Sequence, residues 1–445
     1  MKNLLKGFIN MKRTKIIYMF LMSPPHEKLI SKFNSIEDYT THYAQSVGDL
    51  HYLDVNEEVR RVFFYLQDFC HLLMKEILSR TNDYELEIWR SYLGITQVYT
   101  KEVEGITHRL FPAKKVKKIT GSYKTHSNDL LTRLKKTIKT ENVLLITSYP
   151  SQYTTCFLLK LKPVNVPLIA IHRGWRLARF KSPTKTKFDI IEKLNDSLEI
   201  KCFRKYIDVF RCNIRKQIDY LKNEKGLENV AQFTDGIDYN FYKPCEDKER
   251  LKQELNLPCN KKILLYIGKF TKIKDVDFLI DTYLELLKTR IDILLVLVGG
   301  TVDDEFYNLG KDAGAVMVER TNQQTLLKFN QVADLYILPT RNYIVKNFGG
   351  IGASVIQSLA CGVPVISDNL AHFSGSIEER KKIGFLLENK MKLVENTHLL
   401  LDKPFEKEEI RRISKKYYDK DTNTDVLLKY LSDLSNKYYG LDELV

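Results

Sequence analysis

Residues 261–300 read KKILLYIGKF TKIKDVDFLI DTYLELLKTR IDILLVLVGG. Two apolar runs, Ile263–Ile267 and Ile293–Val298, are rich in leucine and β-branched residues, and each ends at a glycine. The segment between them, near 276–288, has the apolar spacing of a helix buried along one side. Apolar runs that alternate with helical segments predict parallel strands connected by helices. We therefore expect a βαβ unit whose ligand lies beyond the carboxyl ends of the strands.

The same alternation continues along the chain and predicts an α/β protein with two Rossmann-like domains, a cleft between them and a helical C-terminal tail. The domains are expected at 1–235 (basic), 236–420 (Rossmann-like) and 421–445 (C-terminal helix), because the connection at 234–244 is rich in turn residues. Further strands are expected at Ala315–Val318, Leu335–Leu338, Val363–Ser367, Lys15–Met22, Val143–Thr147, Pro167–Ile171 and Ile207–Cys212, and helices near 303–311, 323–331 and 353–361 and around Glu57–Ser79.

Composition narrows the class of protein. With 445 residues, 44% of them hydrophobic, the chain can bury a large core and is not disordered throughout. Its longest apolar runs have about seven residues, whereas a membrane-spanning helix needs roughly 20. Residues 1–235 hold 40 basic and 25 acidic residues, and the remainder holds 30 and 31, so the net charge of +14 belongs to the first half. The N-terminal domain is thus expected to face an anionic partner.

The seven cysteines are scattered and odd in number, and none forms a Cys-x-x-Cys pair. This pattern favours reduced thiols in a cytoplasm over a disulfide framework or a zinc ribbon. The first residues lack the apolar core and cleavage site of a secretion signal. We expect a cytoplasmic protein, with peripheral contact at the inner membrane face left open.

Two lysines follow the strand Ile263–Ile267, in the loop that begins at Gly268. Lys269 and Lys274 are five residues apart. Cations fixed at a strand end stabilise a departing diphosphate, whose negative charge grows in the transition state. The alternative is a pair of solvated lysines on a surface loop.

A second loop rich in glycine precedes a predicted helix. The stretch Phe348–Val365 reads FGGIGASVIQSLACGVPV, and its residues Gly349, Gly350, Ile351 and Gly352 open into the helix. A helix start presents free N–H groups and a positive dipole end to an anion. The pair Gly299-Gly300, at the end of another strand, would allow the backbone to approach a ligand closely. A tight turn before a packed helix would explain either loop without a ligand.

These motifs, in this order, resemble those of retaining GT-B glycosyltransferases, especially glycosyltransferase family 4 (group 1). The resemblance covers roughly 165–370 and includes Asp235-Gly236-Ile237-Asp238, the Gly268–Lys274 loop and the Phe348–Val365 stretch. It implies an acceptor-binding domain at 1–235 and a nucleotide-sugar-binding domain at 236–420. The resemblance further implies transfer of a sugar from the nucleotide-sugar with retention of anomeric configuration, no metal and no cofactor. It also implies donor contacts for Gly268, Gly299, Gly300, Gly349, Gly350, Ile351, Gly352 and Gln357, and catalytic roles for Lys269 and Lys274.

The sequence departs from the family pattern at both signature glutamates. Gln357 stands where the ribose-binding glutamate is expected, and Gly349 stands at the position of the other glutamate. An alignment on Phe348-Gly349 would instead place Lys346 there. An amide can still bond a ribose hydroxyl because it both donates and accepts. Two readings therefore stay open, an active hexosyltransferase and a catalytically inactive partner subunit that binds a nucleotide-sugar.

The first half adds a histidine and a basic region. His172 ends the predicted strand Pro167–Ile171, and by the same resemblance it would lie near the donor sugar with a catalytic role. Between Lys101 and Thr140 there are eleven basic residues and three acidic ones. These cations would suit a glycan or lipid-linked acceptor, or an anionic membrane surface; an ordinary solvated surface is the plain alternative. A nucleic-acid-binding protein is a third and less favoured reading of the basic half. No nucleic acid is expected as a partner, because no nucleic-acid-binding motif accompanies the charge.

Overall fold

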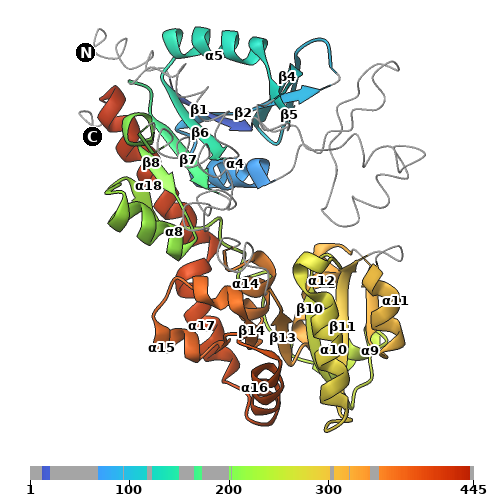
Figure 1. The fold of residues 1–445 in the computed structure, drawn as a ribbon. Coiled ribbons are helices and arrows are strands. Elements are labelled where there is room, and N and C mark those ends of the chain that lie inside the picture. The colour runs from blue at the N-terminus through green and yellow to red at the C-terminus, as the bar shows by residue number, and fades with distance from the viewer. Residues whose placement is uncertain are drawn as a thin grey trace, which may run out of the picture.

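The structure is a computed structural model that describes residues 13–20, 69–93, 95–117, 123–149, 165–172, 200–201, 203–300, 305–319, 321–340 and 350–440. Two parallel-rich sheets, each flanked by helices, form two domains that are stacked one above the other in Figure 1. The predicted α/β class with two Rossmann-like domains is confirmed.

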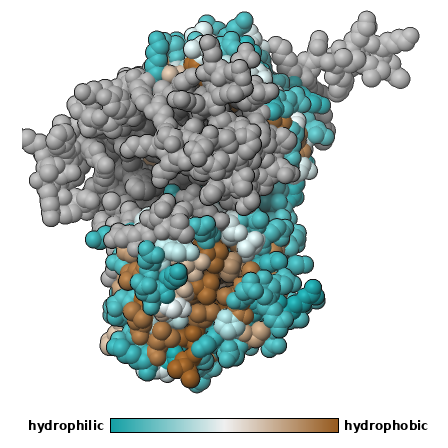
Figure 2. All heavy atoms as spheres, turned by 90° about the vertical axis from the view of Figure 1, so that its right-hand side faces the viewer, coloured by the Kyte–Doolittle hydropathy of each residue, from teal (hydrophilic) through white to brown (hydrophobic). Residues whose placement is uncertain are grey.

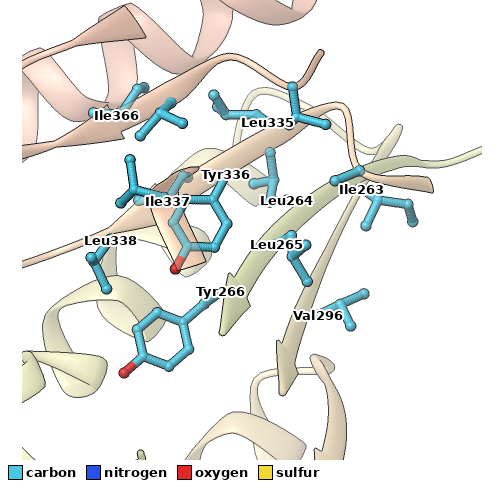
Figure 3. Close-up of a cluster of buried hydrophobic side chains, with 14 of the residues drawn as sticks. Ile263, Leu264, Leu265, Tyr266, Val296, Leu335, Tyr336, Ile337, Leu338 and Ile366 are labelled. Atoms are coloured by element: carbon cyan, nitrogen blue, oxygen red, sulfur yellow. The ribbon is translucent and has the colours of Figure 1, made fainter. Parts of the chain in front are cut away.

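The C-terminal sheet has the order β12-β11-β10-β13-β14-β15, and all its pairs are parallel. Its strands β10, β11 and β13 form the centre, and Figure 3 shows their apolar side chains packed together. The five strands and four helices predicted in this region are confirmed within about two residues. The strands are β10 (Lys262–Ile267), β11 (Ile293–Gly300), β12 (Val316–Glu319), β13 (Leu335–Leu338), β14 (Val365–Ser367) and β15 (Gly384–Phe385), and the helices α10 (Val276–Leu287), α11 (Glu305–Asp312), α12 (Gln323–Val332) and α14 (Ala353–Ala360).

The N-terminal sheet has nine strands in the described residues, in the order β3-β4-β2-β1-β6-β7-β8-β9, with β5 paired to β4. The four predicted strands are confirmed where the structure describes them. Helix α5 (Asn128–Thr140) covers one face and α4 (Phe69–Arg80) the other. The strands are β1 (Thr14–Phe20), β2 (Tyr84–Leu93), β3 (Tyr99–Val103), β4 (Ile106–Lys117), β5 (Tyr123–His126), β6 (Val143–Tyr149), β7 (Leu168–His172), β8 (Val209–Arg211) and β9 (Val230–Ala231).

Strands β2 and β4 escaped the sequence analysis because charged residues are buried in them. Glu87 on β2 is 1% exposed, and it pairs with Arg109 on β4 and Lys15 on β1. On the other face Arg90 contacts His108 Nδ1 at 2.8 Å. A period-two pattern of apolar and polar residues cannot show that the polar ones are inside, since burial depends on partners from other strands.

The C-terminal tail crosses back to the N-terminal domain. Helix α18 (Lys420–Tyr439) follows α17 (Lys407–Tyr418) and packs Leu427, Leu431 and Leu434 into the core that lies against α4. The predicted helical tail is confirmed, and it packs against the N-terminal domain. Where it crosses, Asp419 forms a parallel bridge with Ile237, so the two connections between the domains run side by side.

The strand β12 forms one edge of the C-terminal sheet. Its residues Val316, Met317 and Val318 are only partly buried, and Leu309 on the neighbouring α11 is 43% exposed. Figure 2 shows a hydrophobic patch on this side of the C-terminal domain. Among the helices of the described residues, none combines the length and the apolar character needed to cross a bilayer.

Candidate functional site

The candidate site lies at the carboxyl edge of the C-terminal sheet, between β10 and β13. The chain leaves β10 for β11 on one side and returns to β13 on the other. In open α/β sheets such a change of direction leaves a crevice at which ligands bind. The loop after β10 carries Lys269 and Lys274, and the loop before α14 carries Gly350 to Gly352, so both sequence motifs meet at this edge.

The loop after β10 is held by a buried tyrosine. The Tyr266 hydroxyl donates a hydrogen bond to the Lys269 carbonyl at 2.9 Å. A Cβ on Gly268 would lie 2.8 Å from that hydroxyl, so only glycine lets the ring fold beneath the loop. The loop ends at Asp275, which has a left-handed backbone (φ 51°) and precedes α10. The backbone after β10 therefore has a defined path that fixes where the two lysines start.

The two lysines are close enough to affect one another. Lys269 is exposed and Lys274 is partly buried. Burial, and then the charge of Lys269, lower the pKa of Lys274 below that of an ordinary lysine. No carboxylate of the described residues lies within ion-pair distance of either ammonium group. Two neighbouring cations without an acidic partner form a site at which an anion gains favourable electrostatic energy.

The glycine pair that ends β11 has a packing role. A Cβ on Gly300 would overlap the ring of Phe270, and one on Gly299 would lie 2.9 Å from the Gly268 carbonyl oxygen. Gly299 also has a positive φ of 111°. The pair thus lets the loop after β10 lie directly on the end of β11, and contact of Gly299 and Gly300 with a donor stays a prediction.

Helix α14 begins at the crevice and is fixed to the sheet by a second tyrosine. Gly350 (φ 68°) and Gly352 (φ 85°) bring the chain into the helix. The Tyr336 hydroxyl on β13 lies 2.7 Å from Ser354 Oγ in the first turn and 3.2 Å from the Ile267 carbonyl oxygen. Figure 3 shows the rings of Tyr266 and Tyr336 beneath this edge. The first-turn N–H groups are therefore held in place, with the positive end of the dipole at the crevice.

The N-terminal domain meets this loop directly. Asn213 follows β8, and its side-chain oxygen and nitrogen lie 3.7 and 3.8 Å from the place that a Cβ on Gly350 would occupy. Nearby, Arg215 Nη1 donates to the Gly375 carbonyl at 3.2 Å. These contacts close one side of the crevice with residues that follow the carboxyl end of a strand in the other sheet.

His172 ends β7, next to β8. The pair Ile171 and Arg211 are in register, so the backbone of His172 lies level with Cys212, one residue before Asn213. Adjacent strands are about 5 Å apart, which brings the His172 backbone near the start of α14. The side chain of His172 and the residues Lys346, Phe348 and Gly349 lie outside what the structure describes, so their predicted roles remain predictions.

Gln357 lies in the second turn of α14, beside Tyr242 of the connection between the domains. Burial raises the pKa of Tyr242, and the Gln357 side chain acts against this rise. The structure therefore places Gln357 against the connection, with a ribose contact still to be tested. In the described ranges no cluster of three or more His, Cys, Asp and Glu residues has the arrangement of a metal site.

Comparison with known proteins identifies the domain. Residues 247–420 match the model of a family described as glycosyl transferases group 1. The C-terminal domain is a group 1 glycosyltransferase domain. Among the curated relatives, D-inositol 3-phosphate glycosyltransferase of Corynebacterium aurimucosum is 28% identical over 153 residues, with 32% of this chain and 35% of that protein covered. N-acetyl-alpha-D-glucosaminyl L-malate synthase of Bacillus anthracis is 26% identical over 34% of this chain and 38% of its own length.

The similarity in structure extends beyond the group 1 domain. Sucrose-phosphate synthase from Thermosynechococcus elongatus has a TM-score of 0.62 over 96% of this chain and 100% of its own, at 13% identity. HepE from Anabaena, solved with UDP, has a TM-score of 0.60 over 94% of this chain and 100% of its own, at 12% identity. The chain therefore has the GT-B fold, with the group 1 domain as its C-terminal half.

Sequence reasoning missed Asn213, Ser354 and the two tyrosines beneath the loops. Asn213 directly follows the predicted strand Ile207–Cys212, so the rule that ligands lie beyond carboxyl ends could have found it. Tyr266 and Tyr336 lie inside apolar runs, where nothing in the sequence distinguishes a tyrosine that packs from one whose hydroxyl holds a loop.

Proposed function

We propose that the protein is a glycosyltransferase that moves a sugar from a nucleotide-sugar to a glycan or lipid-linked acceptor, with retention of configuration. The observation that carries the proposal is the meeting of Lys269, Lys274 and the start of α14 at one edge of a group 1 domain. A diphosphate at this edge would meet two cations and the positive end of a helix dipole. All three stabilise the leaving group more as its charge grows.

The donor would lie against the C-terminal domain, and the acceptor would reach the crevice from the N-terminal domain. Asn213 and the backbone of His172 lie on that side of the crevice. A histidine at this place would accept or donate a hydrogen bond at a hydroxyl of the transferred sugar. The chemistry needs no metal, because the lysines take the part that a divalent cation plays in other transferases.

The first experiment is thermal stabilisation by nucleoside diphosphates, followed by turnover of the matching nucleotide-sugar. UDP comes first because HepE was solved with UDP; GDP, ADP and dTDP follow. A nucleotide at about 100 times its dissociation constant adds roughly 2.7 kcal/mol to the free energy of unfolding. We expect one nucleotide to raise the melting temperature and its sugar conjugate to be consumed slowly without acceptor. Stabilisation by none of them would contradict the proposal.

A second reading is a nucleotide-sugar-binding subunit without catalysis, and the residues Gly349 and Gln357 at the signature glutamate positions favour it. In that case the nucleotide still stabilises the protein, but release of the free nucleotide from the conjugate does not exceed that of the Lys269→Ala and Lys274→Met double variant. Chromatography of the nucleotide products separates the two readings.

A further inference from the structure

A groove of about 410 Å³ lies on the N-terminal domain, where α5 borders strand β4 and the segment before β3. Helix α5 covers the face of this sheet that points away from the C-terminal domain in Figure 1. The groove is therefore separate from the crevice at the group 1 domain. Three cations line it, Arg109 of β4 and Arg133 and Lys136 of α5, and Asp129 is the one acidic residue in its lining.

Arg109 is held rigidly at the base of this groove. Its Nε and Nη2 donate to the two carboxylate oxygens of the buried Glu87 at 2.7 and 3.1 Å, and its Nη1 donates to Thr100 Oγ1 at 3.2 Å. These bonds use three of the five N–H groups of a guanidinium. Two N–H groups remain, and their direction is fixed by the other three, so little side-chain entropy is lost when they bind a ligand.

The cations of α5 have no acidic partner in the described part of the chain. Arg133 and Lys136 are exposed and lie three residues apart, on the same side of the helix. On α17, in contrast, Arg412 pairs with Glu409 and Lys416 with Glu379. These two cations of α17 are compensated by neighbouring carboxylates, whereas Arg133 and Lys136 keep their charge for an external anion.

The groove also has an apolar wall. Phe111, which is buried, and Val98, which is 44% exposed, both line the groove. An inorganic anion would leave this wall uncovered. A sugar ring presents C–H groups on one face and hydroxyl or acidic groups at its rim, so it can pack on Val98 while its charge reaches the cations. The concave shape is unsuited to a flat bilayer surface.

We propose that this groove binds an anionic glycan through its carboxylate, sulfate or phosphate groups. The inference rests on the proposed function in one respect, that the glycan belongs to the acceptor. Because the groove lies far from the group 1 domain, it would hold a part of the glycan that is remote from the hydroxyl that receives the sugar. It would thereby select long acidic acceptors over short neutral ones.

The test compares two double variants of α5. Arg133→Gln with Lys136→Gln removes two charges that line the groove, and Lys135→Gln with Lys139→Gln removes two exposed charges of the same helix outside it. Binding of oligogalacturonate, a heparin-derived hexasaccharide and neutral maltohexaose is measured by isothermal titration at fixed ionic strength. Thermal unfolding and the response to UDP are recorded for each variant.

We expect both acidic oligosaccharides to bind the wild-type protein and maltohexaose not to bind. The groove variant should raise the dissociation constant at least tenfold, and the control variant less than threefold. Equal losses in the two variants would overturn the inference, because they would show a diffuse charge effect. The inference would also be overturned if no acidic oligosaccharide bound the protein, or if anionic phosphatidylglycerol vesicles bound it and the oligosaccharides did not. If the glycans bind the groove and no nucleotide binds the protein, the proposal of a glycan-binding groove is supported and the proposed transferase function is contradicted.

Discussion

The hydroxyl of Tyr336 lies 2.7 Å from that of Ser354, and this contact joins the centre of the C-terminal sheet to the first turn of α14. The same tyrosine hydroxyl is 3.2 Å from the carbonyl oxygen of Ile267, at the end of β10. One buried ring thus sets the spacing between the lysine loop and the helix start. The proposed diphosphate site depends on that spacing, because its cations and its N–H groups come from these two separate elements.

Replacing Tyr336 by phenylalanine should weaken nucleotide binding more than its effect on stability suggests. The change leaves Ser354 Oγ and the Ile267 carbonyl with one fewer partner, at a cost of about 1–2 kcal/mol in the free energy of unfolding. Tyr283→Phe on α10 serves as the control, since Tyr283 is also buried and its hydroxyl interacts with the backbone of Leu295 on β11. Denaturant unfolding and nucleotide titration together check this; equal nucleotide affinity in the two variants would contradict it.

Replacing Lys269 or Lys274 should lower kcat far more than replacing Lys272, the lysine between them. Lys269→Ala and Lys274→Met should each lower kcat about 100-fold, because each removes a charge that stabilises the leaving diphosphate. Lys272→Ala is the matched control, as Lys272 is exposed in the same short turn. Its kcat should stay within about twofold of wild type. Initial rates of donor consumption measure all three, and a comparable loss in the control would refute a specific role for the pair.

Activity should fall at alkaline pH earlier than an ordinary lysine would require. Burial and the charge of Lys269 lower the pKa of Lys274, so Lys274 loses its proton at a lower pH than a solvated lysine. Lys269→Met removes the repelling charge and should move the alkaline limb of kcat/KM to higher pH, while the rate at neutral pH falls. A limb that does not move, or moves to lower pH, would show that another group controls it.

How much the sequence could predict differs between the two halves for a physical reason. In β10 to β14 both faces of each strand are apolar, so a single sequence carries the whole signal. In β2 and β4 the buried positions hold Glu87, Arg90 and His108, and the cost of burying them is offset by contacts between these two strands and by partners from β1 and α4. The lysine loop and the glycine loop were predictable because their residue types fit one ligand chemistry. Asn213 was missed because it belongs to the N-terminal domain, whereas the glycine loop that it meets belongs to the C-terminal domain.

The buried carboxylate Glu87 should make the N-terminal domain sensitive to acid. Burial alone would raise its pKa, but hydrogen bonds from Arg109 and Trp89 and the charge of Lys15 lower the pKa to about 2. A depressed carboxylate pKa contributes stability above its unfolded value of about 4.5, and this stability is lost as the pH falls toward 2. The contribution is on the order of 3 kcal/mol.

The variant Glu87→Gln should therefore be destabilised at pH 7 and should lose less stability than wild type between pH 5 and 3. Glu85→Gln, which removes a mostly exposed partner of Lys15, is the control and should behave like wild type. Chemical denaturation across this pH range gives the two slopes. Parallel curves for Glu87→Gln and wild type would show that other carboxylates cause the acid sensitivity.

Any side chain at Gly236 should destabilise the protein, because the two connections between the domains run side by side there. A Cβ there would lie 2.5 Å from Lys420 Cα, and the residue has a positive φ of 68°. Gly226 has a similar φ of 61°, but no atom lies within 4 Å of its Cβ position, so it isolates the backbone effect. Gly226→Ala should cost about 1 kcal/mol, the usual price of a left-handed conformation. Gly236→Ala should cost about 2–4 kcal/mol, because the backbone of α18 must also move.

Since α18 packs into the N-terminal core, that movement changes how the domains meet, and the dissociation constant for the acceptor should rise in Gly236→Ala but not in Gly226→Ala. Equal costs in both variants would show that the two connections separate freely.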